Sequence, residues 1–273
     1  MTKQLRLTLD DASGFISHLI KQREPNKKTI THGTWLLNGG YPEVFVARNL
    51  SRKLLFSSYV QTYIDRDVRG TIKSANLNEF EKFLRILAGR TAQILNYSVI
   101  AREVGVTVPT VKSWVSLLEA GGIIYLLPPY YRNFGKRLIK SPKCYFMDTG
   151  LVCYLVGLQS TEHLLNGPMA GALFETACVT QFVKRFSALL DPCSLYFWRS
   201  TDGLEVDLLI ESAEKNIPIE IKLSATISHQ HTQSLRKWLG VSGGRSEAGV
   251  ILSCSRKGGL VGRNIFNCHY SWL

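Results

Sequence analysis

Four charged residues in the C-terminal part of the chain have types and spacings that could build a metal site. They form two short runs, Glu205-Val-Asp207 and Glu220-Ile-Lys222. Alternate residues of a strand point to the same face, so two paired strands would bring three carboxylates and one ammonium group into a small volume. Hard divalent cations prefer oxygen ligands and often combine one or two carboxylates with substrate phosphates. The lysine could hold a water nucleophile or offset the charge of a scissile phosphate. The pattern therefore predicts the site of a metal-dependent phosphodiesterase.

A further acidic residue, Glu175, lies in a predicted helix over about residues 170–189. It is flanked by Leu173, Phe174 and Ala177. A carboxylate in such apolar surroundings is costly unless it is paired or bound to a metal. Glu175 is therefore a candidate fifth member of the cluster. The alternative is that the strand acids are surface residues of amphipathic strands.

The hydrophobic pattern predicts the elements that position these residues. Four runs typical of strands follow the helix that carries Glu175. A second predicted helix, over about residues 228–239, lies between the last two of these runs. The expected strands are Leu195 to Arg199, Glu205 to Glu211, Ile217 to Lys222 and Ala248 to Ser253. This mixture of strands and helices indicates an α/β module.

The middle of the chain has the pattern of a helix-turn-helix. Residues 97–104 and 107–119 are typical of two short helices, and Gly105 suits the end of the first one. An apolar strand over residues 123–127 follows, which is the order of a winged helix. A DNA reader would place the second helix in the major groove, with Lys112 facing outward. Winged helices also dock proteins, and both interpretations stay open.

A basic segment follows, from Pro128 to Lys143, without an acidic residue. Aromatic side chains alternate with the cations, which suits phosphate contact and base stacking. The basic residues predicted to bind nucleic acid, together with Lys112, are Arg132, Lys136, Arg137, Lys140 and Lys143. The alternative is a solvated β-wing whose aromatic residues, Tyr130 among them, pack on the body of the protein.

The overall charge also favours a polyanionic partner. The 273 residues include 33 Lys and Arg against 21 Asp and Glu, a net charge of +12. A basic excess of this size predicts DNA as a partner, although solubility alone is an alternative explanation.

Several classes of site and location are not expected. The chain lacks a G-x-x-x-x-G-K-[ST] run, so no ATP site is predicted. The six cysteines contain no C-x-x-C pair and are expected to be buried free thiols. No apolar run is long enough to cross a membrane, and Asp10 and Asp11 lie where a signal peptide needs apolar residues. We therefore expect a cytoplasmic protein without a membrane partner.

Several motifs together resemble the C-terminal part of prokaryotic AAA-type ATPases that carry a domain of unknown function. They occur in this order: Gly39-Gly40-Tyr41-Pro42-Glu43, Tyr63-Ile-Asp-Arg-Asp67, Ser141 to Leu151, Gly171-Ala-Leu-Phe-Glu175, Tyr196-Phe-Trp-Arg199, Glu205-Val-Asp207 and Pro218-Ile-Glu-Ile-Lys222. In that family a P-loop ATPase precedes a winged helix and a restriction-endonuclease-like domain of the PD-(D/E)xK type. The ATPase half is missing here, so the chain is expected to be a truncated frame, a fragment or a stand-alone descendant.

The resemblance implies roles for the acidic cluster. Asp207 and Glu220 would bind Mg²⁺ or Mn²⁺ with help from Glu175, Lys222 would orient the attacking water, and Glu205 would be auxiliary. Asp207, Glu220 and Lys222 are thus the candidate catalytic residues.

The resemblance also implies a fold of α+β or α/β class. Residues 1–75 would be a helical N-terminal segment, 76–160 the winged helix with its basic wing, and 161–273 the nuclease-like domain. The expected function is a Mg²⁺-dependent, nuclease-like DNA-binding protein. The alternative is a non-catalytic module that binds nucleic acid or protein beside a partner ATPase.

Overall fold

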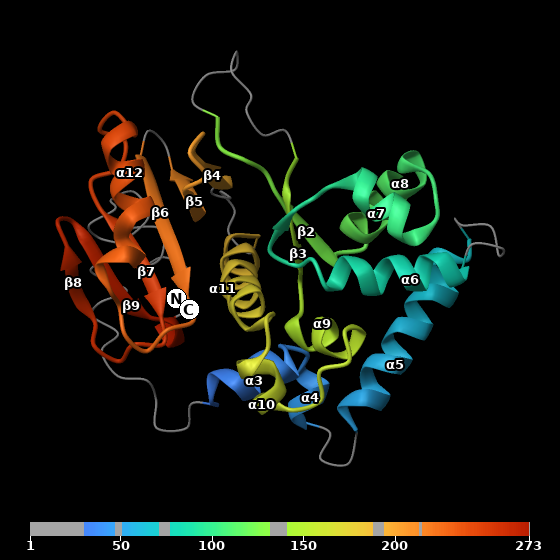
Figure 1. Ribbon diagram of the computed structural model, residues 1–273. Coiled ribbons are helices and arrows are strands. Elements are labelled where there is room, and N and C mark those ends of the chain that lie inside the picture. Colours follow the sequence, from blue (N-terminus) through green and yellow to red (C-terminus); the bar gives the residue numbers. More distant parts are fainter. Residues whose placement is uncertain are drawn as a thin grey trace. The chain divides into compact units, whose positions relative to one another are not determined.

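The computed structural model describes residues 30–46, 51–70, 77–131, 141–187, 194–212 and 215–272. They divide into two compact units. The helical unit comprises Ile30–Leu126 and Ser141–Thr180, and the described part of the sheet unit comprises residues 127–131, 181–187, 194–212 and 215–272. The expected mixture of helices and strands is confirmed (Figure 1). In these ranges, none of the helices combines the length and apolar character that a membrane span requires.

The helical unit contains short helices and a three-stranded sheet in the order β1-β3-β2. Its strands are β1 (Gln93–Ile94), β2 (Ile124–Leu127) and β3 (Lys143–Phe146). Its helical elements are α3 (His32–Asn38), α4 (Pro42–Val46), α5 (Arg52–Tyr63), the π-helix η1 (Ile64–Val68), α6 (Leu77–Ala88), α7 (Tyr97–Val104), α8 (Val108–Ala120), α9 (Thr149–Leu155), α10 (Thr161–Asn166) and most of α11 (Ala170–Ser187).

The predicted helix-turn-helix residues form two helices joined by a glycine turn. Gly105 ends α7 in the left-handed conformation, with φ of 93°. Thr107 begins α8, and its hydroxyl accepts a hydrogen bond from the backbone N–H of Thr110. The rings of Phe80 and Phe83 on α6 contact Trp114 of α8 at centroid distances of 5.4 and 5.3 Å. This aromatic contact fixes the second helix on the body of the helical unit.

Asp148 joins two glycine-containing motifs of the helical unit. Its Oδ2 accepts a hydrogen bond from the N–H of Gly40 at 2.7 Å, and its Oδ1 caps α9 through the N–H of Leu151. Gly150 lies so close to the chain at Asn38 that a Cβ there would overlap the Asn38 carbonyl oxygen. These contacts give the Gly39-Gly40 turn and the start of α9 a packing role.

The sheet unit contains a mixed six-stranded sheet in the order β4-β5-β6-β7-β9-β8. Its strands are β4 (Ser194–Arg199), β5 (Glu205–Ser212), β6 (Lys215–Lys222), β7 (Gly249–Ser253), β8 (Gly259–Gly262) and β9 (Ile265–His269). β6, β7 and β9 are parallel, and the other neighbouring strands pair antiparallel. The first four strands lie where the hydrophobic pattern predicts them. β8 and β9 were not predicted, because glycine and polar residues interrupt their apolar pattern.

Helix α12 (Gln233–Val241), preceded by the 3-10 turn η3 (His229–Thr232), packs on the sheet beside β6 (Figure 1). Its Leu235 and Trp238 join a buried cluster with residues of β5, β7 and β9. Tyr130 packs against this cluster and contacts the Trp238 ring at 5.3 Å. The structure therefore gives Tyr130 the packing role that the sequence left as an alternative to base stacking.

Gly150→Ala should lower the free energy of unfolding by about 1–3 kcal/mol, because the added methyl group overlaps the Asn38 carbonyl and the Phe56 ring. Chemical denaturation measures the change. Gly171→Ala is the control, since a Cβ at this helical position meets no atom within 4 Å and is expected to be neutral or slightly stabilising. Equal stability of the two variants would contradict the packing account.

Candidate functional site

Asp207 and Glu220 stand opposite each other at the end of the β5–β6 ladder. The last registered pair is Leu208 with Ile219, and each acid is the next residue beyond it. Beyond this pair, the Asp207 side chain provides the hydrogen-bond acceptor for β6: its Oδ2 accepts a hydrogen bond from the backbone N–H of Ile221 at 2.8 Å. The two carboxylates are 6% and 4% exposed. Strand pairing therefore buries two predicted site residues side by side.

Lys222 completes the core of the site. Its Nζ lies 2.6 Å from Oε1 of Glu220 and 3.8 Å from Oδ2 of Asp207. About a third of the lysine side chain is exposed, whereas both acids are buried. The structure thus brings together the three residues predicted to be catalytic, with the lysine on the solvent side of the pair.

Ser234 is a member of the site that sequence reasoning missed. It lies on α12, and its hydroxyl donates a hydrogen bond to Oε2 of Glu220 at 2.8 Å. Ser234 is itself buried. The sequence did predict a helix over this segment, but nothing in the spacing of Ser234 and Glu220 indicated that the helix packs on the end of β6.

The electrostatics of the site are dominated by burial. Removal from water raises the pKa of Glu220, and the neighbouring Asp207 carboxylate raises it further. The Lys222 ammonium and the Ser234 hydroxyl act in the opposite direction but do not cancel the rise, so the pKa of Glu220 is raised to about 8. Glu220 therefore keeps its proton at pH values where an exposed glutamate has lost it.

The site lies at an edge where three parallel strands end. Lys222 on β6 is registered with Ser253 on β7, and Ser253 with His269 on β9. Ser253 donates a hydrogen bond to Oδ1 of Asn267 at 2.7 Å. In open α/β sheets, ligands bind outside the carboxyl ends of the strands. This polar edge is therefore the place where the fold would present Asp207, Glu220 and Lys222 to a ligand.

The other two predicted acids have partners elsewhere. Glu205 lies 3.8 Å from the guanidinium of Arg199. Glu175 belongs to the helical unit, where its Oε1 accepts hydrogen bonds from Lys143 Nζ at 2.8 Å and from the Tyr145 hydroxyl at 2.6 Å. Among the residues that the structure describes, no group of three or more His, Cys, Asp and Glu is arranged to hold a metal ion. Within the sheet unit, the cluster contains the carboxyl groups of Asp207 and Glu220 and the ammonium group of Lys222.

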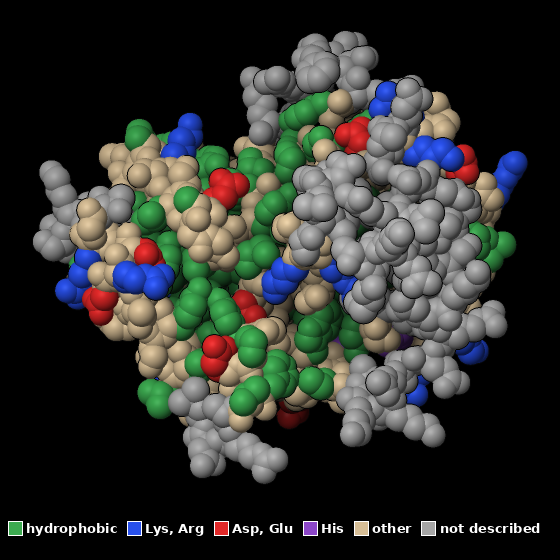
Figure 2. Space-filling model, turned by 180° about the vertical axis from the view of Figure 1, so that it is seen from behind, with side chains coloured by type: hydrophobic (Ala, Val, Ile, Leu, Met, Phe, Trp, Pro, Cys, Tyr) green, Lys and Arg blue, Asp and Glu red, His purple; other side chains and the backbone are tan. Residues whose placement is uncertain are grey.

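The residues predicted to bind nucleic acid differ in exposure, and only two of them are among the described residues. Lys112 is exposed on α8, with its ammonium 5.7 Å from the centre of the Tyr97 ring. Lys143 is buried in its ion pair with Glu175, which removes it from the exposed basic surface. The remaining four, Arg132, Lys136, Arg137 and Lys140, lie outside the described residues. On the face shown in Figure 2, the described Lys and Arg side chains are interspersed with acidic ones.

The two parts of the chain resemble domain families without an assigned function. Residues 32–162 match the domain of unknown function DUF8612, and residues 170–268 match the domain of unknown function DUF4143. The chain is 30% identical over 193 residues to the uncharacterized proteins Mb2031c of Mycobacterium bovis and Rv2008c of Mycobacterium tuberculosis. The match covers 70% of this chain and 43% of each relative, so the chain spans less than half the length of these curated proteins.

Glu220→Gln should change how stability depends on pH. The folded pKa of Glu220, about 8, lies above its ordinary value of 4.5, so the folded protein keeps a proton that the unfolded chain has lost. The resulting stabilisation is present at low pH and is lost as the pH rises towards the folded pKa. Between about pH 5 and pH 8, we expect the wild type to lose more than ~1 kcal/mol of unfolding free energy relative to the variant. Parallel denaturation curves across this range would contradict the assignment.

Glu175→Ala should destabilise the helical unit, because it removes the carboxylate that pairs with the buried Lys143 ammonium. Breaking a buried ion pair from one side typically costs about 3–5 kcal/mol. The double variant Lys143→Met, Glu175→Leu should recover most of this loss in chemical denaturation. A single variant as stable as the wild type would show that the pair does not support the fold.

Proposed function

We propose that the sheet unit is a metal-dependent phosphodiesterase domain that acts on nucleic acid. One observation carries the proposal: Asp207, Glu220 and Lys222 meet within ion-pair distance at the carboxyl edge of the parallel strands. Asp207 and Glu220 would hold Mg²⁺ or Mn²⁺, and Lys222 would serve the attacking water or the scissile phosphate.

The donor set suits a small divalent cation. Two adjacent carboxylates supply hard oxygen ligands, and Mg²⁺ typically completes its shell with water and substrate phosphate rather than with a full protein cage. The raised pKa of Glu220 follows first from burial and then from the neighbouring Asp207 carboxylate, and it supports the same choice because a bound cation would stabilise the charged form of Glu220. When bound, such an ion would polarise the phosphate and lower the pKa of a coordinated water.

The residues of the chain have separate tasks in this proposal. Ser234 fixes one oxygen of Glu220, so the other oxygen is directed towards Lys222. The ammonium of Lys222 neutralises part of the negative charge of the two acids when no substrate is present. Because its side chain is partly exposed, it is able to turn towards a phosphate when another cation takes over that neutralisation.

The proposal extends to the fold and the partners. The order α11, β4, β5, β6, α12, β7 supports a restriction-endonuclease-like arrangement, and α7, α8 and β2 support a winged helix. The net charge of +12 supports DNA as the substrate. The resemblance to the C-terminal part of AAA-type ATPases supports an ATPase as the protein partner.

A specific observation favours a second candidate, a non-catalytic binding module. Lys222 is paired with Glu220 at 2.6 Å, and Glu175 is engaged by Lys143 and Tyr145. A site whose charged groups pair with each other can have a structural role in the protein without catalysing a reaction. Such a module would bind DNA without metal, and phosphate contacts would make its affinity fall steeply with salt.

Cleavage of a plasmid and of short oligonucleotides with Mg²⁺ or Mn²⁺ tests the first candidate. Asp207→Asn and Lys222→Met should each lower the rate about a hundredfold or more, a usual range for losing a group that acts in the reaction. Lys215→Met is the matched control, since Lys215 lies at the other end of β6 and pairs with Glu247 on the surface.

A wild type no more active than Asp207→Asn would contradict catalysis. DNA binding that survives Asp207→Asn and chelation of metals would then support the non-catalytic module.

A further inference from the structure

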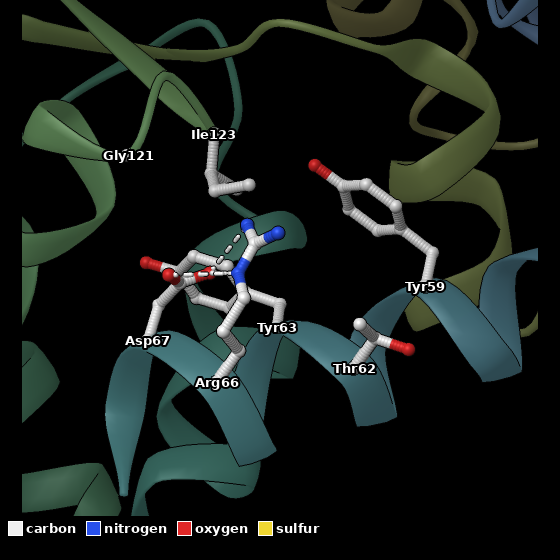
Figure 3. Close-up of a pocket in the computed structure, with 7 residues that line it drawn as sticks. All are labelled: Tyr59, Thr62, Tyr63, Arg66, Asp67, Gly121 and Ile123. Atoms are coloured by element: carbon white, nitrogen blue, oxygen red, sulfur yellow. Dashed lines mark hydrogen bonds and ion pairs between the residues drawn. The ribbon is translucent and has the colours of Figure 1, made fainter. Parts of the chain in front are cut away.

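A second site candidate lies in the helical unit, whereas the residues proposed for catalysis belong to the sheet unit. It is a cavity of about 290 Å³, here called the Tyr59 pocket, on the side of α5 and η1. Tyr59, Thr62, Tyr63, Arg66 and Asp67 line it from this continuous helical stretch. Gly121 and Ile123, at the end of α8 and before β2, close the other side (Figure 3). These residues overlap the Tyr63-Ile-Asp-Arg-Asp67 motif, which the proposed phosphodiesterase chemistry does not use.

The backbone here has an uncommon form. Ile64–Val68 is a π-helix, which continues α5 with wider turns. Such turns are rare and occur often at functional sites. Because Arg66 and Asp67 both lie in this segment, the wide turn sets the direction of the two charged groups that line the pocket.

The pocket has firm aromatic walls. Tyr63 is buried, and Gly121 makes room for it, since a Cβ at Gly121 would come within 3.1 Å of the Tyr63 hydroxyl oxygen. Burial raises the pKa of Tyr63 to about 12, so this wall remains uncharged at neutral pH. The ring of Tyr59 packs against the ring of Tyr41, at a centroid distance of 5.1 Å. Both tyrosine walls are therefore held in place by their own neighbours.

One charged pair provides directional hydrogen bonding. Nε and Nη2 of Arg66 donate to the Asp67 carboxylate at distances between 3.0 and 3.2 Å. The remaining nitrogen, Nη1, points away from Asp67 and towards the side that Tyr59 forms (Figure 3). The guanidinium is 76% exposed at the side chain, so a ligand reaches it without displacing protein atoms. A ligand here meets a hydrogen-bond donor beside an acceptor, with nearly balanced charge.

We propose that the Tyr59 pocket binds a nucleobase, either of a free nucleotide or of an unpaired nucleic-acid strand. A base is flat and stacks on aromatic rings, and its edge carries acceptors next to donors that match Arg66 and Asp67. The cavity has the size for a base with part of its sugar and lies at the small end of ligand pockets. The balanced ion pair disfavours a bare phosphate, which needs unpaired cations. This proposal does not depend on the phosphodiesterase proposal.

Titration of the wild-type protein with AMP, GMP, CMP and UMP, and with a short mixed-sequence single-stranded DNA, tests the pocket. Saturation-transfer NMR detects contact with the base protons, and calorimetry gives the affinity. We expect at least one mononucleotide or the DNA strand to bind through a base. Binding of the DNA alone would assign the base to a strand, and binding of a mononucleotide alone would assign it to a free nucleotide.

Two matched pairs of variants place the binding. Thr62→Trp fills the pocket from an exposed position on α5, whereas Ser57→Trp adds the same side chain at an exposed position of the same helix that does not line the pocket. Arg66→Met removes the donor, whereas Arg69→Met removes an exposed arginine paired with Asp65. The first member of each pair should weaken binding about tenfold or more, because Thr62→Trp blocks the pocket and Arg66→Met removes a hydrogen-bonded contact. The second member should leave binding unchanged.

Three results would overturn the proposal. The first is that no mononucleotide and no strand binds the wild type. The second is that ribose 5-phosphate or N-acetylglutamine amide competes as well as the nucleotide, which would assign the pocket to a phosphate or a peptide ligand. The third is that Thr62→Trp and Ser57→Trp bind equally well, which would place the binding elsewhere on the protein.

Discussion

The sheet unit depends on the burial of two carboxyl groups side by side where a strand ladder ends. Asp207 uses one oxygen to satisfy the N–H of Ile221, so its carboxylate is part of the backbone hydrogen bonding of β6. This contact holds Asp207 beside Glu220, and the resulting repulsion must be offset by neighbouring groups. Lys222 and Ser234 offset only part of it. The same constraint that shapes the end of the sheet thus raises the pKa of Glu220.

In the helical unit, by contrast, neighbouring groups compensate the charge of the acidic residues. Glu175 is matched by the ammonium of Lys143 and the hydroxyl of Tyr145, so its charge is compensated within the unit. Asp148 is likewise used in structure, through Gly40 and the start of α9. Several motifs that carry the family resemblance therefore have a packing explanation. The contrast makes the partly compensated pair in the sheet unit the better candidate for chemistry.

Much of the candidate site followed from the sequence because its members are close along two adjacent strands. The alternation in Glu205-Val-Asp207 and Glu220-Ile-Lys222 correctly predicted strands, and pairing of neighbours along the chain brought Asp207 and Glu220 together. Glu205 differs because it lies next to Arg199 of β4, a cross-strand partner that spacing does not reveal. The contacts of Ser234 and the Lys143–Glu175 pair were missed as well, because each contact depends on how a helix packs, which spacing along the chain does not reveal. The strands β8 and β9 were not predicted, because their formation depends on pairing with neighbouring strands more than on their own apolar pattern. β9 pairs with β7, and β8 pairs with β9.

The most direct test of the account is to locate Mn²⁺ in crystals soaked at neutral pH, using its anomalous scattering. The account predicts one strong peak between the carboxylates of Asp207 and Glu220, with the Lys222 ammonium displaced from Glu220. The peak should disappear in Asp207→Asn crystals. An unchanged Lys222–Glu220 ion pair without an anomalous peak, at Mn²⁺ concentrations that saturate surface sites, would contradict a metal-binding role for the pair.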